Sequence, residues 1–573
     1  MSLYDKSSLV LIPSGAKNGK VFSQKPVSGA GDFTFSRGSN LSATRVNASQ
    51  LIEKGRENIF VQSNQFDTTW LLASATITGG QSGYDGTNNA WKLQDTAVSA
   101  EHFVRQTPNV GNIVSVSVYA KANTLNFLWL RSVEGGVNKR TWFDLSSGSV
   151  GTSQGIDANI ESVGNGWYRC SATFNHQAAF EYYIAISDAN GSSSYAGTGN
   201  GSIYIQDAQL EKSLVATPYI ETGASTAQAG ILENTPRFDY SGGATCPSLL
   251  LEGSRTNLVT QSEYFGDSSW VKYGVGVGIT PIVTPNYAIS PDGTQNASRL
   301  QCDLNGGNTT SDRSWLYQAI TTISGDNTFS LYVKNNLNEE ITFTLSNGSS
   351  ETVVVLSDGK WHRLSTVKSG GGQPRIGLIG GVGASDTADL SIYGAQLEQG
   401  SYPTSYIPTM GVSQTRAVDD VNELTGATSL IGQSEGTMFL DFVANDDDAL
   451  QIIYQVRTTG STNLGQVDFR IQSGNLRALG NDGGSPQYNI SAGAAVVGTR
   501  YKCAVRYATN DVAFYVNGVL KGTDTNASFG SSSLDQITFN ENGSLYSPSV
   551  NVKQALLFKT GLTNTELASL TTI

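Results

Sequence analysis

Apolar and polar residues alternate along much of this chain, as they do in β-strands with one buried face. From Val114 to Lys121 every second residue is apolar, and this is the period at which strand side chains return to the same face. Similar short runs follow, separated by turns of Gly, Asn and Ser: Phe127 to Leu130, Trp142 to Leu145, Tyr168 to Phe174, Tyr182 to Ile186 and Ser202 to Gln206. No helical stretch separates them, so the pattern predicts an all-β fold of antiparallel β-sandwiches.

Part of this pattern occurs twice. Glu53 to Trp70 reads EKGRENIFVQSNQFDTTW, and Glu252 to Trp270 reads EGSRTNLVTQSEYFGDSSW. Further along, GNGWYR returns as SDGKWHR, and AQLE occurs in both copies with a Tyr-Ile pair after it. The spacing between matching positions shrinks toward the end, so the second copy has lost loop residues while keeping its framework. We expect the repeated Arg, Asn and Trp to serve this scaffold.

The repeats divide the chain into six expected segments. These are a lead-in (1–57), a first sandwich (58–222), a connector (223–255), a second sandwich (256–409), a connector (410–434) and a third domain of different sequence (435–573). The lead-in is too short for a core of its own and should pack on the first repeat or on a partner. Arg45, Arg237 and Arg416 recur in the connecting segments, where we expect surface or interdomain hydrogen bonds.

The third domain carries two local signals. Asn517-Gly518 lies between two strand-like runs and predicts a type I′ hairpin, whose turn needs positive φ angles. Thr563 and Glu566 have the spacing of a capping box that opens a short helix near the end.

Composition narrows the function classes. Charged residues are 15% of 573, against roughly 25% in an average globular protein, and 63 glycines suit many turns. The net charge of −12 argues against binding a nucleic-acid backbone. The longest apolar runs, such as Val353 to Leu356, fall short of the roughly 20 residues of a membrane span. The N-terminus lacks the pattern of a secretory signal, so we expect synthesis in a cytoplasm.

Catalytic chemistry has little support in the sequence. The three histidines, His102, His176 and His362, are far apart and lack metal-site spacing. The four cysteines lack CxxC spacing, and we interpret them as buried free thiols. Many acids are available, so a carboxylate pair of the glycosidase type stays open. We predict a protein that is not an enzyme.

Sugar binding is the alternative that the aromatic residues favour, because sugars stack on aromatic faces. Trp70 and Trp167 have counterparts at Trp270 and Trp361 and are assigned to the framework. The remaining tryptophans, with three tyrosines of the third domain, are the candidates for glycan contact: Trp91, Trp129, Trp142, Trp315, Tyr454, Tyr488 and Tyr546.

No cofactor is expected, with one exception. Asp446, Asp447 and Asp448 form an acidic run that could help to hold Ca²⁺, which binds several oxygen ligands. A solvated loop is the commoner explanation of such a run.

Three stretches carry resemblances to known families. AFYVNGVLKG (513–522), followed by VKQALLFKTGLTNTEL (552–567), resembles concanavalin A-like and laminin-G-like jelly rolls. GNGWYR, AQLE and LLLEGSRTNL are similar to carbohydrate-binding-module-like β-sandwiches of tailed-bacteriophage fibres. The opening SLVLIPSGAKNGKVFSQKP with DFTFSRGSNLSATRVN is similar to structural proteins of Bacteroidota phages, including crAss-like phages.

Together the resemblances imply a virion protein, displayed as a head or tail fibre that engages surface glycans. They also imply attachment to other virion proteins through residues 1–57 and a homo-oligomer, with a trimer as the expected state. Three alternatives stay open at this point. One is a structural or decoration protein without a ligand, and another is a polysaccharide-degrading enzyme. The third is a secreted bacterial adhesin, which the missing signal pattern disfavours.

Overall fold

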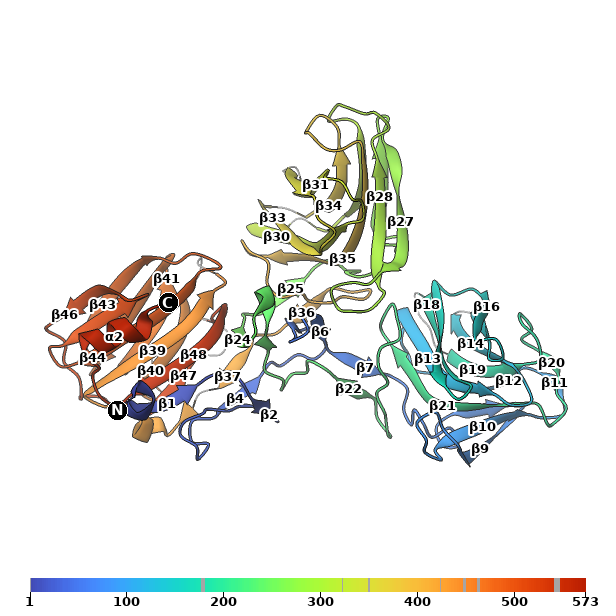
Figure 1. The fold of residues 1–573 in the computed structure, drawn as a ribbon, viewed down its shortest axis with the longest axis horizontal. Coiled ribbons are helices and arrows are strands. Elements are labelled where there is room, and N and C mark those ends of the chain that lie inside the picture. Colours follow the sequence, from blue (N-terminus) through green and yellow to red (C-terminus); the bar gives the residue numbers. More distant parts are fainter. Residues whose placement is uncertain are drawn as a thin grey trace.

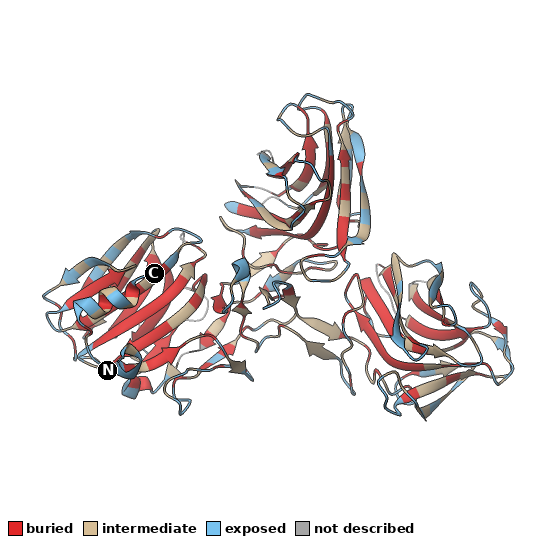
Figure 2. Ribbon diagram, viewed as in Figure 1, coloured by how far each residue is buried: buried red, intermediate tan, exposed pale blue. Residues whose placement is uncertain are grey.

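The computed structural model describes residues 2–134, 136–176, 181–321, 323–348, 351–370, 372–422, 424–446, 450–460, 464–539 and 547–573. Within these ranges the chain is all-β, built of tandem antiparallel β-sandwiches, with two short α-helices, α1 (Leu3–Lys6) and α2 (Asn564–Thr571). In this described part, neither helix is long and apolar enough to cross a membrane. Figure 1 shows three lobes that meet at a centre, and Figure 2 shows buried residues gathered inside each lobe.

The first repeat is a sandwich of two six-stranded sheets, in the orders β17-β18-β13-β21-β10-β9 and β16-β15-β14-β19-β12-β8. The strands are β8 (Leu71–Ala73), β9 (Ala75–Gln81), β10 (Ala90–Asp95), β12 (His102–Gln106), β13 (Asn112–Ala122), β14 (Phe127–Glu134), β15 (Val137–Asp144), β16 (Ser149–Ser153), β17 (Asp157–Gly164), β18 (Trp167–His176), β19 (Glu181–Ser187) and β21 (Ser202–Glu211). Val116 and Val118 of β13 lie in the core between the sheets, as the alternation predicts.

The second repeat has two five-stranded sheets, in the orders β26-β29-β34-β31-β32 and β27-β28-β35-β30-β33. The strands are β26 (Trp270–Val275), β27 (Ile279–Ala288), β28 (Ala297–Asp303), β29 (Arg313–Gln318), β30 (Asp326–Asn335), β31 (Ile341–Asn347), β32 (Glu351–Leu356), β33 (His362–Ser369), β34 (Pro374–Ile379) and β35 (Thr387–Gln399). Among the described strands, β16 and β17 of the first repeat have no counterpart here. The shrinking spacing in the sequence therefore reflects the loss of one edge strand from each sheet.

The repeated residues form the framework of each sandwich. The Trp70 indole N–H donates to the Gln62 carbonyl at 3.0 Å, and Trp270 donates to Gln261 in the same way at 2.8 Å. Asn58 and Asn257 both bridge the AQLE strand to the chain that leaves the sandwich. The expected scaffold role of these residues is confirmed. Trp361 differs from its counterpart Trp167 in being only half-buried.

The third lobe is assembled from distant parts of the chain. Its sheets have the orders β23-β24-β48-β39-β44-β45-β46, with β1 also paired to β48, and β38-β47-β40-β41-β42-β43. The strands are β1 (Ser7–Leu11), β23 (Phe238–Asp239), β24 (Ser248–Leu251), β38 (Leu424–Thr425), β39 (Glu435–Ala444), β40 (Gln451–Arg457), β41 (Gly465–Gln472), β42 (Asn475–Asp482), β43 (Ser485–Ala494), β44 (Arg500–Ala508), β45 (Val512–Val516), β46 (Val519–Asp524), β47 (Gln536–Thr538) and β48 (Val550–Phe558). The lead-in and both connectors thus complete the last domain.

This arrangement corrects one expectation. The lead-in packs mainly on the third lobe and meets the first repeat near its end, through Arg56, because β1 pairs with β48 and its Leu9 and Leu11 lie in the core of the third lobe. A second strand of the lead-in, β4 (Phe33–Ser36), pairs with β37 (Asp420–Asn422) and adds Phe33 and Phe35 to that core. Apolar side chains of the lead-in are therefore buried within the chain itself.

The centre between the lobes is held by buried charges. Arg237 and Arg416 both contact Glu252, at 2.8 and 3.0 Å, and Arg37 contacts Asp419 at 3.3 Å. Burial opposes ionisation of Glu252, but Arg416 and Arg237 outweigh it and hold the pKa of this carboxyl well below its usual range. For Arg237 and Arg416 the interdomain expectation is confirmed. By contrast, Arg45 pairs with Glu53 near the surface at 2.8 Å.

The predicted hairpin and helix cap are confirmed, whereas the prediction of buried cysteines holds for three of the four. Asn517 and Gly518 have φ angles of 50° and 80°, which confirms the predicted turn, and Thr563 caps α2 through a complete capping box. Cys170, Cys302 and Cys503 are buried free thiols, but Cys246 is exposed. It lies in the loop between β23 and β24, where the short hairpin leaves no core to enter.

Candidate functional site

An open pocket lies at the end of the first repeat where the chain enters and leaves the sandwich. Its volume is about 700 Å³. The lining consists of one indole ring, several amide side chains, a carboxylate and glycines: Gln62, Asn64, Gln65, Gly79, Gly80, Asn88, Asn89, Trp91, Glu221, Thr222 and Gly223. Two of the wall-forming stretches, 62–65 and 221–223, belong to the duplicated framework.

Trp91 on β10 is held firmly while remaining half-buried. Its indole N–H donates to the carbonyl of Asn64 at 2.9 Å, and its ring meets Phe66 edge-on with centroids 6.3 Å apart. The backbone of Gly79 lies so close that an added Cβ would be 3.1 Å from the ring. A fixed ring that is partly open to a pocket can accept the apolar face of a sugar.

Amide groups surround the ring. The Asn89 side-chain oxygen accepts from Gln206 at 2.8 Å, so this amide is held in place. The side chains of Gln62, Gln65 and Asn88 form no hydrogen bond within the described part of the chain. Each amide offers donors and acceptors that match sugar hydroxyls. The pocket therefore combines a stacking surface with unused polar groups.

A repeated turn that the sequence analysis missed positions this wall. Asp85-Gly86-Thr87 recurs as Asp292-Gly293-Thr294. The carboxylate of Asp85 accepts from the Thr87 backbone N–H at 3.0 Å, and Asp292 accepts from Thr294 at 2.8 Å. Both glycines have positive φ angles, near 83°. The recurring DGT and the Asn-Ala two residues later were the signal that could have revealed the site.

In the second repeat the corresponding end is covered by the first repeat and by the lead-in, whose Lys54 pairs with Glu263 at 2.7 Å and with Asp292 at 3.1 Å. Tyr264 and Met410, which stand where the first repeat has Gln65 and Gly223, pack with Ile113 and Leu214 of the first repeat. Asn286, whose positive φ matches that of Gly80, donates from its side chain to Asp157 at 2.8 Å. The same surface is a docking face in one copy and an open pocket in the other.

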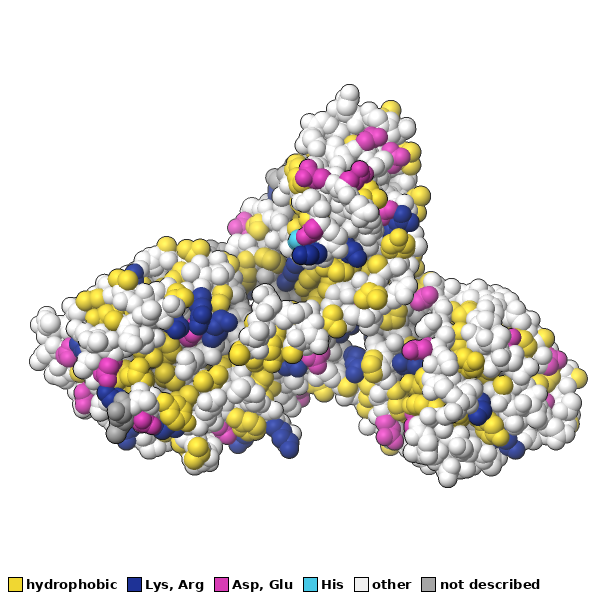
Figure 3. Space-filling view, in the orientation of Figure 1, with side chains coloured by type: hydrophobic (Ala, Val, Ile, Leu, Met, Phe, Trp, Pro, Cys, Tyr) yellow, Lys and Arg dark blue, Asp and Glu magenta, His cyan; other side chains and the backbone are white. Residues whose placement is uncertain are grey.

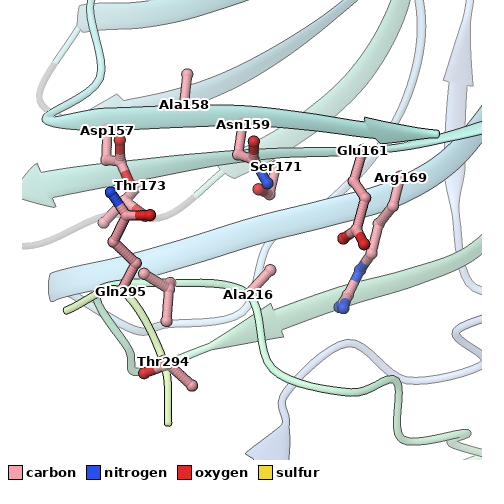
Figure 4. A pocket seen from close by; sticks show the side chains of 11 residues that line it. Asp157, Ala158, Asn159, Glu161, Arg169, Ser171, Thr173, Ala216, Thr294 and Gln295 are labelled. Atoms are coloured by element: carbon pink, nitrogen blue, oxygen red, sulfur yellow. The ribbon is translucent and has the colours of Figure 1, made fainter. Parts of the chain in front are cut away.

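The joint between the repeats leaves a second, polar groove of about 310 Å³. Figure 4 shows Asp157, Asn159 and Glu161 along β17 and Arg169 beside them, with Thr294 and Gln295 of the second repeat across the groove. Among its lining residues there is no aromatic ring. This groove lacks the stacking surface that the Trp91 pocket has.

Most of the other predicted aromatics are structural. Trp129 and Trp142 lie together, with ring centroids 6.0 Å apart, and are at most 4% exposed. Trp315 packs against Tyr273 and is also 4% exposed. These rings have almost no free face for a sugar, which corrects the expectation that they contact a glycan.

The tyrosine candidates of the third lobe give the same result. Tyr454 and Tyr488 are buried in its core, with exposures of 0% and 4%, and burial raises the pKa of both hydroxyls well above the usual value. Tyr546 lies outside the described residues. Among the six predicted contact residues that the structure describes, Trp91 lines an open pocket and the other five are buried.

The calcium expectation stays a prediction. Asp446 is buried at the end of β39, whereas Asp447 and Asp448 lie outside the described residues. Within the described ranges no group of three or more His, Cys, Asp or Glu side chains is placed to hold a metal ion.

Comparison with known proteins gives only distant likenesses. No family model and no curated protein matches the chain. The chain is similar to the CBM40 of the Ruminococcus gnavus IT-sialidase, with 18% identity, 26% of this chain and 88% of that chain covered, and a TM-score of 0.23. It is also similar to domains LG4-5 of the mouse laminin α1 chain, with 12% identity, 51% and 94% covered, and a TM-score of 0.19. A third similar structure is the LG1-3 region of the laminin α2 chain, with 10% identity, 80% of this chain and 95% of that chain covered, and a TM-score of 0.17.

Proposed function

We propose that this chain is a non-enzymatic virion fibre or adhesin of a tailed phage, and that its first repeat engages surface glycans through the Trp91 pocket. The observation that carries the proposal is the difference between the repeats. Where the second repeat has Tyr264, Met410 and a serine at position 298, the first has Gln65, Gly223 and Trp91. These differences open the pocket and place an aromatic face inside it.

The surface supports this choice of ligand. Figure 3 shows one face of the molecule on which uncharged polar side chains and backbone alternate with hydrophobic areas, and charged groups are scattered among them. Uncharged hydroxyl and amide groups suit ligands that are themselves rich in hydroxyls. No Lys or Arg lines the Trp91 pocket, so the proposed ligand there is an uncharged part of a glycan.

One pocket of this kind binds weakly, and the proposal includes assembly. In a homo-oligomer, for which a trimer is the proposed state, several copies of the pocket face the same cell surface. Linked sites raise the overall avidity by roughly 10²–10⁴ without new contacts.

Attachment to other virion proteins remains part of the proposal. Because the lead-in is built into the third lobe, its partners would bind exposed positions rather than an unfolded arm. Val27, Tyr4 and Phe22 are 94%, 51% and 40% exposed and offer an apolar contact surface on this segment.

An array of bacterial surface polysaccharides, probed with the full chain, tests the glycan-binding role. We expect selective binding that falls about tenfold in Trp91→Ala, because the variant loses the stacking surface; for comparison, a nucleobase stacked on an aromatic ring contributes on the order of 1–3 kcal/mol. Tyr287→Ala is the matched control, because Tyr287 is an exposed aromatic outside the pocket, and it should bind as the parent does.

Two results would overturn the proposal. Absence of binding to every polysaccharide would favour a purely structural virion protein. Release of new reducing ends from a bound polysaccharide would identify an enzyme.

A further inference from the structure

The outer face of the sheet that contains β14 carries a second cluster of unusual composition. The register aligns Arg105 of β12 with Tyr183 of β19, Tyr183 with Arg131 of β14, and Arg131 with Arg140 of β15. Beside this row runs an aromatic one, in which Phe103 and the Trp129–Trp142 pair flank Ala185. We call the two rows together the arginine face.

The guanidinium groups of the arginine face are stacked on rings. The Arg131 guanidinium lies 3.5 Å from the centroid of Tyr183 and 5.4 Å from that of Trp129. Arg140 lies 5.6 Å from Trp129, and Arg105 lies 5.4 Å from Tyr183. Stacking fixes the plane of a guanidinium and leaves its edge, where the N–H groups point, free to bind.

Many of these N–H groups are unused. Glu101 accepts from one nitrogen each of Arg131 and Arg140, at 2.7 and 3.0 Å. Glu181 accepts from one nitrogen of Arg105. The Nε atoms of all three arginines are buried and have no hydrogen-bond partner in the described part of the chain. The second terminal nitrogen of Arg105 and that of Arg140 form no hydrogen bond in the described part of the chain and are not buried, so they can donate to a carboxylate that approaches from solvent.

Charge points to the sign of that acceptor. Three arginines face two glutamates, which leaves an excess of one positive charge in a chain whose net charge is −12. The side chains of Arg105, Arg140, Glu101 and Glu181 are 21–30% exposed, so a ligand can reach the cluster from solvent.

We propose that the arginine face is a second binding site, specific for a carboxylated sugar such as a uronic acid residue. The sugar carboxylate accepts from the solvent-facing terminal nitrogen of Arg105, and the half-buried ring of Phe103, two residues away on the same strand, offers an apolar surface beside it. The site is separate from the Trp91 pocket, which has no cationic lining. The corresponding row of the second repeat lacks this cluster. There Tyr317 pairs with Arg375, Arg375 with Ser346, and Ser346 with Glu351, so the row contains a single arginine.

Titration of the full chain with D-glucuronate and with D-glucose tests the proposal, because these two sugars differ in one carboxylate. We expect glucuronate to bind at least about tenfold more tightly, consistent with charge-assisted contacts, and to bind more weakly as salt is raised. Arg105→Gln should remove most of this preference, and Arg140→Gln, at the other end of the row, should reduce it less. Arg375→Gln, on the corresponding face of the second repeat, should leave it unchanged.

Several outcomes would contradict the proposal. Equal binding of the two sugars would do so, as would a glucuronate preference that survives both arginine substitutions. Equally tight, arginine-dependent binding of a poly-glutamate peptide would show that the face serves an acidic peptide instead. Trp91→Ala should retain the glucuronate preference, so failure of the Trp91 pocket and failure of the arginine face are distinguishable.

Discussion

Trp91 and Ser298 occupy corresponding positions, and the contrast between them shows how a single residue changes the use of a surface. Ser298 is fully buried, whereas Trp91 is half-buried and lines an open pocket. Residue type alone did not separate Trp91 from Trp129, since both lie on strands of the same sandwich. Burial separates them, because Trp129 is covered by its neighbours on the outer face of its sheet.

Asp207 behind the pocket provides a test of local electrostatics. Burial raises the pKa of this carboxyl to about 6, although Tyr84 donates a hydrogen bond to it at 2.8 Å. A raised pKa means that the folded state binds the proton more tightly than the unfolded state, whose pKa is near 4. Stability is therefore lost as the pH rises from about 4 through about 6.

Asp207→Asn removes the ionisable carboxyl and with it the loss of stability at higher pH. We expect the variant to be more stable than the parent by about 2–3 kcal/mol at pH 8 and by much less at pH 4. Asn also tolerates the positive φ of 53° at this position. Denaturation of both proteins at the two pH values measures the effect, and a pH-independent difference would contradict it.

Glu252 tests the buried charges of the centre, and the duplication supplies its control. Glu252→Gln leaves Arg237 and Arg416 without a full countercharge, so we expect the centre to lose about 3–5 kcal/mol. The corresponding surface change, Glu53→Gln, should cost about 0–1 kcal/mol.

Hydrogen exchange of the Asp419 backbone amide reports this loss, because that amide donates to the carbonyl of Glu252 at 3.0 Å. Exchange measures the free energy of local opening. Equal effects of the two substitutions would contradict a special role for the buried cluster.

Among the strands, removal of β1 tests most directly whether the lead-in belongs to the third lobe. The pairing of β1 with β48 predicts that removal of residues 2–12 exposes β48 and takes Leu9 and Leu11 out of the core of the third lobe. Since each large buried side chain contributes about 1.5–3 kcal/mol, the truncated third lobe should become protease-sensitive while the two repeats stay resistant. Limited proteolysis with mass spectrometry checks this, and a third lobe that stays resistant would contradict the assignment.

The elements show where sequence reasoning succeeds. Strands such as β13 were predictable because alternation is a local property, and the Asn517-Gly518 hairpin because its turn has few solutions. The membership of β1 and β24 in the third lobe was not, because pairing with β48 joins parts of the chain that are hundreds of residues apart. The Trp91 pocket was half predictable. Its ring was identified, but its opening depends on what packs against each repeat.

At the scale of the whole molecule, the two repeats extend from a third lobe that the lead-in and connectors complete (Figure 1). The second repeat docks its end on the first through Asn286 and Tyr264. No sandwich of the described chain covers the same end of the first repeat, where the pocket lies. Each chain therefore has one pocket-bearing end that neither the second repeat nor the third lobe covers, and an oligomer would present several of these ends together.

If the first repeat binds glycan because this end is open, side chains that fill the end should prevent binding. Gly80→Asn and Gly223→Met, combined in one protein, install there the residues of the second repeat. An added Cβ meets nothing within 4 Å at either position, and Asn tolerates the positive φ of 74° at Gly80, as Asn286 does in the second repeat, so the fold should tolerate both changes. We predict that thermal stability stays nearly unchanged and that binding to the polysaccharide identified on the array falls about as far as in Trp91→Ala, because the added side chains fill the pocket and keep the glycan from the ring. Undiminished binding by the folded double variant would contradict the account.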